Sequence, residues 1–293
     1  MALRLERPSD AGAFLALAGD WLGQREAEHN LILGILGALL EAPPAADEDP
    51  PYLAAAVDAG GAVVGAVVRT LPTRAVLSEV DDPDAIDLLA ADLAASTPGL
   101  TSIVGPAGWA APLAQGIAAT LGRPARLGMS ERAFRLRAVI APRPVDGRAR
   151  LATMDDRALV FEWLDAFEVE AIGDTRVSEG PDPGFQGRVE RGLRHEGSRR
   201  IWLWEDDGPV SLTGVSGPTP HGIRIGPVYT PPGVRGRGYA SACVAAASQA
   251  ELDRGRTFTF LFTDVANPTA NHIYQAIGYE PVRDVDAYRF GAA

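Results

Sequence analysis

The same order of predicted elements occurs twice along this 293-residue chain. In each half, a helical stretch precedes a two-stranded hairpin, which is followed by strand, helix, strand, helix and strand. The two halves meet at Arg137–Arg150, a segment with two prolines and a glycine. Because single cores rarely grow beyond about 250 residues, two units of this size are expected. We therefore predict two domains, residues 1–142 and 151–293, joined by a linker at 143–150.

The hairpins of the two halves have matching turns. Asp58-Ala59-Gly60-Gly61 separates strands at 52–57 and 62–70, and Asp206-Asp207-Gly208 separates strands at 200–205 and 209–216. An acidic residue begins each turn, and glycine stands where a positive φ is expected. The remaining predicted elements are helices at 24–41, 84–95, 111–121, 156–171, 238–254 and 268–277, and strands at 74–80, 100–104, 133–140, 223–230, 257–265 and 282–290.

Composition excludes several classes of protein. Hydrophobic residues make up 46% of the chain and the formal charge is -11, so a folded protein is expected and a nucleic-acid partner is not. The apolar run Leu31–Leu40 is too short to span a bilayer and Met1–Asp10 lacks signal features, which predicts a cytoplasmic protein with no membrane partner. The single cysteine, Cys243, is expected in a buried helix face. With four histidines and one cysteine, the sequence shows no cluster with metal-ligand spacing, so no metal is expected. The sequence leaves open whether the protein forms a homodimer.

The most informative segment starts with the strand Ile225-Gly-Pro-Val-Tyr-Thr230. Gly226 and Pro227 interrupt the strand pattern, which predicts a bulge or an edge position. The following Arg235-Gly-Arg-Gly-Tyr-Ala240 opens a helical pattern. Its glycines let the backbone approach an anion closely, the helix start presents main-chain amides, and guanidinium groups suit phosphate oxygens. This loop therefore predicts a pyrophosphate site.

A second motif follows the next strand. Thr257–Val265 is almost wholly β-branched or aromatic, as expected for a buried central strand. Asn267 and Pro268 are typical of the start of a helix, and Gly278 is typical of its end. Tyr274 falls on this short helix, where a phenol beside a thioester is suited to act as an acid.

In this order the two motifs resemble those of the GNAT N-acetyltransferase superfamily. Arg235–Ala240 matches its phosphate-loop pattern of Gln or Arg, two variable positions, Gly, one variable position, and Gly or Ala. Asn267–Tyr279 is similar to its second signature, an Asn-capped helix that bears a tyrosine and ends in Gly-Phe or Gly-Tyr. The resemblance implies a mixed α/β (α+β) fold with two tandem GNAT-like domains, each a central mixed, mostly antiparallel sheet flanked by helices. The first would be a degenerate copy, because Asp81-Asp82-Pro83-Asp84 replaces the loop and its carboxylates would repel a pyrophosphate.

The resemblance also implies an enzyme, an N-acetyltransferase with acetyl-coenzyme A as co-substrate and a small-molecule or peptide amine as acceptor. The main chain of Val228, Tyr229 and Thr230 would pair with the pantetheine arm, and Tyr274 matches the usual general acid. The loop amides would hold the pyrophosphate, and an asparagine would touch the cofactor. These cofactor-binding residues are Arg235, Gly236, Arg237, Gly238, Tyr239, Ala240, Ser241, Asn267 and Asn271.

The sequence leaves the general base and the acceptor open. Glu168, Glu170, Glu205 and His221 are candidate bases, although each is more typical of solvated surface. The acidic balance favours a cationic acceptor such as a polyamine or an aminoglycoside. Two alternatives stand beside the enzyme, a non-catalytic acyl-coenzyme A-binding or regulatory protein and the transfer of a different acyl group. If the first half is degenerate, Leu151–Ala293 alone should bind acetyl-coenzyme A.

Overall fold

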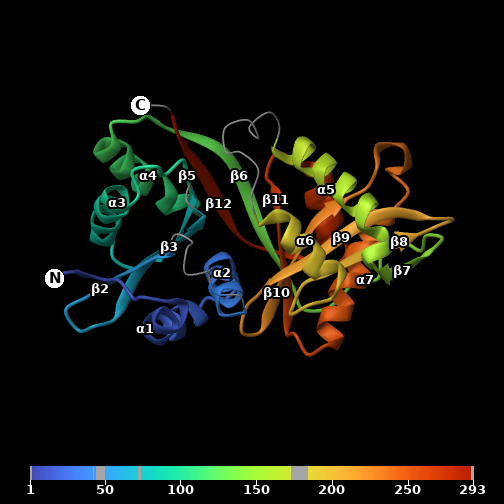
Figure 1. Ribbon diagram of the computed structural model, residues 1–293, viewed down its shortest axis with the longest axis horizontal. Helices are drawn as coiled ribbons and strands as arrows, with labels where there is room; N and C mark the ends of the chain where they lie inside the picture. Colours follow the sequence, from blue (N-terminus) through green and yellow to red (C-terminus); the bar gives the residue numbers. More distant parts are fainter. Residues whose placement is uncertain (1, 42, 44–49, 72–73, 173–183, 292–293) are drawn as a thin grey trace. The chain divides into compact units, whose positions relative to one another are not determined.

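The computed structural model describes residues 2–41, 43, 50–71, 74–172 and 184–291 (Figure 1). They fall into two compact units that interleave along the chain. The first unit consists of Met1–Ala133, Phe262–Asn267 and Pro281–Ala293, and the second of Phe134–Leu261 and Pro268–Glu280. The division predicted from the sequence follows chain order, whereas these units exchange short segments near the end of the chain.

The first unit is built on a mixed, mostly antiparallel sheet. Val285–Arg289 of its last strand pairs antiparallel with Ser102–Pro106, so the final strand of the chain extends the sheet formed by the first half. The other neighbours are antiparallel, except that β4 and β5 are parallel. The strand order is β1 (Arg4–Glu6), β2 (Tyr52–Val57), β3 (Val63–Leu71), β4 (Arg74–Val80), β5 (Ser102–Pro106) and β12 (Glu280–Phe290).

Helices cover both faces of this first sheet (Figure 1). Successive side chains of a strand point to opposite faces. In β2, Tyr52, Ala54 and Ala56 pack in the core beneath α3 and α4, while the alternating Leu53, Ala55 and Val57 pack beneath α1 and α2. The helices are α1 (Ala11–Gly23), α2 (Asn30–Glu41), α3 (Asp84–Ser96) and α4 (Ala107–Leu121).

The second unit repeats this plan. Its strands run in the order β7 (Arg148–Leu151), β8 (Arg200–Glu205), β9 (Pro209–Pro218), β10 (Gly222–Tyr229) and β11 (Phe258–Asp264), and only β10 and β11 are parallel among the pairs described. One core lies beneath α5 (Arg157–Ile172) and α6 (Phe185–Leu193), and another beneath α7 (Tyr239–Asp253) and α8 (Pro268–Ala276). The predicted mixed α/β class and tandem arrangement are confirmed.

Both sheets carry the same bulge. Opposite Gly214 of β9 lie two residues of β10, Gly226 and Pro227, because the register shifts between Ile225 and Val228. In the first sheet, Ser78 and Glu79 of β4 lie opposite a single residue of β3 in the same way. The structure confirms a bulge at Gly226 and Pro227. Because β4 has the same bulge, the two units share this detail as well as their strand order.

Several elements differ from the sequence-based expectation. The helix predicted over 24–41 begins only at Asn30, and the strand predicted at 133–140 is β6 (Ala125–Leu136), which starts and ends earlier. The prediction missed α1, α6, β1 and β7. The strands β1 and β7 are too short to show a hydrophobic period, and α1 depends on a local cap, the bond from the Ala13 N–H to the Asp10 carboxylate at 2.9 Å. Among the described helices, none is long and apolar enough to cross a membrane.

Candidate active site in the second unit

The site predicted from the sequence lies where β10 and β11 stop pairing. Their parallel ladder joins Gly222–Arg224 to Phe258–Phe260, and β10 then continues through its bulge to Tyr229. Beyond Arg224, the structure pairs β10 with β9 alone among the described strands. Main-chain groups on the other edge of β10 are therefore available to an extended ligand. Val228, Tyr229 and Thr230 occupy this stretch or its immediate end.

The end of β10 is fixed from the β9 side. The Ser211 hydroxyl lies 3.2 Å from the Tyr229 carbonyl and 2.8 Å from the Thr230 hydroxyl. A Cβ atom on Gly214 would lie 2.7 Å from the carbonyl oxygen of Gly226, which is too close for any larger residue. The bulge therefore requires glycine at 214.

The loop after β10 has the conformation that its glycines predict. A short 3-10 turn at Pro232–Val234 leads to Gly236 and Gly238, whose φ angles are 78° and 93°. Side chains other than glycine rarely adopt this left-handed region. A Cβ atom on Gly238 would also lie 2.9 Å from the Val145 side chain. Gly238, the N-cap of α7, is thus constrained both by its φ angle and by the contact with Val145.

Six consecutive main-chain amides of this loop are left without an internal acceptor. Among the described residues, none accepts a hydrogen bond from the N–H groups of residues 236–241, and the first bond of α7 runs from Ala242 to the Gly238 carbonyl at 3.0 Å. Amides at a helix start, aligned with the helix dipole, form an anion site. The predicted residues Gly236, Arg237, Gly238, Tyr239, Ala240 and Ser241 therefore fit a diphosphate.

The two loop arginines contact protein groups. The Arg235 Nε donates to the Thr230 carbonyl at 2.7 Å, and its Nη2 donates to both carboxylate oxygens of Glu170 at 2.9 and 2.7 Å. The Tyr239 hydroxyl donates to the Asp206 carboxylate, and Arg237 interacts electrostatically with the same hydroxyl. The bond to Asp206 raises the pKa of Tyr239. Direct contact of either guanidinium with phosphate stays a prediction.

Tyr274 lies on α8 with its ring against the core and its hydroxyl uncommitted. Its ring meets that of Tyr279 edge to face at 6.1 Å between centroids. Burial raises the pKa of Tyr274 to about 12, so the phenol is neutral at pH 7. Within the part of the chain that the structure describes, no group is hydrogen-bonded to this hydroxyl. A neutral, unbonded phenol is available to donate to a ligand.

Comparison with known proteins places this geometry in a family. A model of the acetyltransferase (GNAT) family matches residues 159–279, a range that contains β10, the glycine loop and Tyr274. Residues 159–279 form a GNAT domain. Comparison with curated proteins finds no match.

Solved structures extend the similarity to the whole chain. A tandem GNAT protein from the clavulanic acid biosynthesis pathway is 17% identical, with a TM-score of 0.56, and the match covers 99% of this chain and 98% of that one. A Drosophila protein is 14% identical over 98% of both chains with a TM-score of 0.66. A GCN5-related N-acetyltransferase from Sphaerobacter thermophilus is 15% identical, with a TM-score of 0.60 and coverage of 98% and 95%. At these identities the similarity shows the fold alone.

The remaining predicted residues of the GNAT domain lie on or beside α8. Asn267 directly precedes this helix, and its N–H donates to the Asp264 carbonyl at 3.0 Å. Asn271 lies on the helix, and its neighbour His272 is exposed. Contact of either asparagine with a cofactor stays a prediction. Cys243 is fully buried on α7, which confirms its expected packing role.

The candidate bases of the GNAT domain have other roles in the structure. Glu170 holds Arg235, and Glu205 accepts a hydrogen bond from Arg150 at 2.7 Å. Glu168 interacts electrostatically with Arg188. His221 directly precedes β10, at the opposite end of this strand from Val228. None of these contacts assigns a base.

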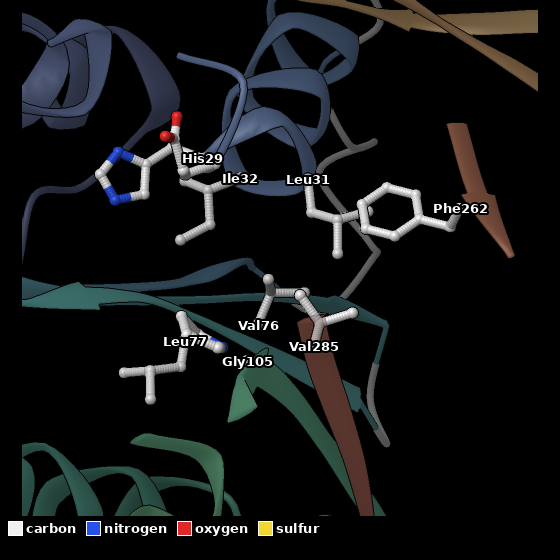
Figure 2. A pocket seen from close by; sticks show the side chains of 10 residues that line it. His29, Leu31, Ile32, Val76, Leu77, Gly105, Phe262 and Val285 are labelled. Carbon is white, nitrogen blue, oxygen red and sulfur yellow. The ribbon is translucent and has the colours of Figure 1, made fainter. Parts of the chain in front are cut away.

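The first unit has a small cavity where β4 and β5 stop pairing, which is the counterpart of the point where β10 and β11 separate (Figure 2). The parallel pairing of β4 and β5 ends at Val76 and Val104, and beyond it lies a cavity of about 10 Å³. A single water molecule needs about 10–15 Å³ on the same measure. Figure 2 shows the side chains that line this cavity, which include Leu31, Ile32, Val76, Leu77, Phe262 and Val285. No pantetheine arm fits in this volume.

In the first unit, polar side chains contact the bulge of β4 and the turn that follows this strand. The Glu79 N–H donates to Nε2 of the buried His29 at 3.2 Å, and the Glu79 carboxylate pairs with Arg283. The Asp81 carboxylate accepts from Trp21 at 2.7 Å and from Arg25 at 2.6 Å. Of these residues the sequence singled out Asp81 alone, because residue types are visible in a sequence but their convergence on β4 is not.

Proposed function

We propose that the chain is an N-acetyltransferase that moves the acetyl group of acetyl-coenzyme A to a primary amine of a small molecule or peptide. One observation carries the proposal, the row of six main-chain amides at residues 236–241 beside the open edge of β10. A diphosphate suits the amides, and an extended pantetheine arm suits the strand edge. Membership of residues 159–279 in the GNAT family supports acyl transfer in general.

The reaction requires a neutral amine and a stabilised oxyanion. An alkyl ammonium with a pKa of about 10.4 must lose a proton to a base or to water before its nitrogen attacks the thioester carbon. As the new C–N bond forms, negative charge develops on the carbonyl oxygen. A main-chain N–H on the open edge of β10, past Arg224, is suited to donate to that oxygen. The attacking nitrogen then loses its second proton to the base or to water, and collapse of the intermediate breaks the C–S bond and releases the thiolate of coenzyme A.

Tyr274 is the proposed partner of the leaving thiolate. With a pKa of about 12, the phenol is protonated at neutral pH and is a weaker acid than a thiol with an ordinary pKa of about 8.5. Complete proton transfer from Tyr274 to the sulfur is therefore uphill. We expect the hydroxyl to donate a hydrogen bond that strengthens as charge develops on the sulfur, and the thiolate to take its final proton from water.

A thiol-release assay tests the proposal. The protein is mixed with acetyl-coenzyme A and a panel of amines that includes a polyamine and an aminoglycoside, and a thiol reagent detects free coenzyme A. All 27 basic residues are arginine, so no lysine side chain can consume the acyl donor as background. Amine-dependent thiol release and an acetylated product by mass spectrometry are expected. Binding of acetyl-coenzyme A without release for any amine would favour the non-catalytic alternative, and release only with another acyl donor would change the assigned group.

A further inference from the structure

Glu170 forms an ion pair with Arg235, the first arginine of the phosphate loop. It stands in the last turn of α5, and both of its carboxylate oxygens lie within 2.9 Å of the Arg235 Nη2. The Arg235 Nε is held at the same time by the Thr230 carbonyl, and its guanidinium lies 5.7 Å from the centre of the Tyr229 ring. Three contacts therefore fix one side chain between the end of β10 and the loop amides.

A bound diphosphate would be a second anion for the same guanidinium. An arginine fork pairs with a carboxylate or with a phosphate through the same N–H groups. The Glu170 carboxylate also lies beside a loop that would carry the negative charge of the ligand, and like charges repel. Both effects weaken the binding of a phosphate-bearing ligand, so they have the same sign.

We propose that Glu170 competes with the phosphates of the co-substrate for Arg235, and so lowers the affinity of the loop for coenzyme A. The inference rests on the proposed function, because it requires that coenzyme A binds at residues 236–241. Through this competition, Glu170 keeps the release of product coenzyme A fast. Since both partners of the pair are about half exposed, at 46% and 45%, solvent screens the competition and makes it modest.

Isothermal titration of the full chain with coenzyme A tests the proposal. Glu170→Gln removes the charge and keeps the size, and we expect it to tighten binding by about two- to five-fold in low-salt buffer. The gain should shrink at about 0.5 M salt, where surface charges are screened. Glu168→Gln is the matched control, because it removes an equal charge from the same helix two positions earlier, where the carboxylate interacts with Arg188.

Two further arms separate the outcomes. In an Arg235→Gln background, the effect of Glu170→Gln should disappear, because the competition acts through that guanidinium. Unchanged or weaker binding by Glu170→Gln, with an unaltered melting temperature, would overturn the inference, as would an equal gain from Glu168→Gln. Absence of binding by the wild-type protein would instead overturn the proposed function.

Discussion

Tyr274 on α8 and Tyr279, just after this helix, are both buried but have different hydrogen-bonding environments. Tyr274 and Tyr279 share a ring contact, and burial raises the pKa of both. The Tyr279 hydroxyl lies 2.8 Å from the hydroxyls of Ser248 and Thr259, whereas the Tyr274 hydroxyl has no bonded group among the described residues. The first is built into the core, and the second remains available to a ligand.

Phenylalanine substitutions should separate these roles. Tyr274→Phe is expected to lower turnover by about 10²-fold, because the leaving sulfur loses its hydrogen-bond donor, while the melting temperature and the affinity for coenzyme A stay unchanged. Tyr279→Phe should cost about 1–3 kcal/mol of unfolding free energy, because it leaves two buried hydroxyls with a lost partner. Turnover and thermal unfolding of both variants provide the measurement, and a full rate for Tyr274→Phe would exclude its assigned role.

His29 should make the stability of the first unit depend on pH. Its Nδ1 donates to the Leu22 carbonyl at 2.9 Å and its Nε2 accepts from the Glu79 N–H, which is the neutral tautomer. Burial, the main cause, lowers the pKa of His29 below its ordinary value, and Arg25 and Arg283 lower it further. Protonation therefore favours unfolding.

The stabilisation by neutral His29 is complete above the unfolded pKa of about 6.5 and is lost as pH falls through the lower folded value. We expect the unfolding free energy of the wild type to fall below pH 6.5 more steeply than that of His29→Gln, by at most about 1.4 kcal/mol per pH unit. Denaturant titrations from pH 5 to 8 measure the difference, which is expected below about pH 6.5. Parallel curves for the two proteins would show that His29 does not titrate in this range.

At the scale of elements, the two repeats share strands and a bulge but differ in the link from strand to helix. Only Asp81–Pro83 joins β4 to α3, whereas the longer loop after β10 includes Gly236 and Gly238. This difference was visible in the sequence, because turns and loops depend on neighbouring residues. The cavity beside β4 was not visible in the sequence, because the side chains that line it come from separate elements such as α2 and β12.

A glycine pair tests the loop. Gly238→Ala must place a Cβ at a φ of 93° and 2.9 Å from the Val145 side chain, so we expect the affinity for coenzyme A to fall by at least about ten-fold. Gly233→Ala, in the 3-10 turn nearby, meets nothing within 4 Å and should leave the affinity unchanged. Titration calorimetry compares the two variants, and equal affinities would contradict the assigned loop.

At the scale of the whole molecule, the repeats are interleaved rather than simply consecutive. Strand β12 ends the second half of the chain but pairs with β5, and Phe290 packs in the first unit's core. Phe134 and Leu136, from the end of the first half, are fully buried in a core of the second unit. Local sequence patterns could not reveal this exchange, because it pairs segments that are distant in sequence.

The exchange changes the expectation for isolated halves. A fragment of residues 151–293 lacks Phe134 and Leu136, and loss of one buried aromatic side chain alone costs about 3–5 kcal/mol. A fragment of residues 134–280 keeps the second unit together and leaves out the strand that pairs with β5. We expect the fragment of residues 134–280 to unfold at a higher temperature than the fragment of residues 151–293 in thermal denaturation. A more stable 151–293 fragment would show that chain-order domains describe the molecule better.

Hydrogen exchange at the glycine loop tests the central claim most directly. Amides that lack an internal acceptor exchange quickly, and hydrogen bonds to a ligand slow their exchange. On saturation with coenzyme A, we predict that exchange at residues 236–241 becomes markedly slower, while the Asp81–Asp84 segment of the first unit is unaffected. Continued fast exchange at 236–241 in the saturated protein would show that the diphosphate is held elsewhere.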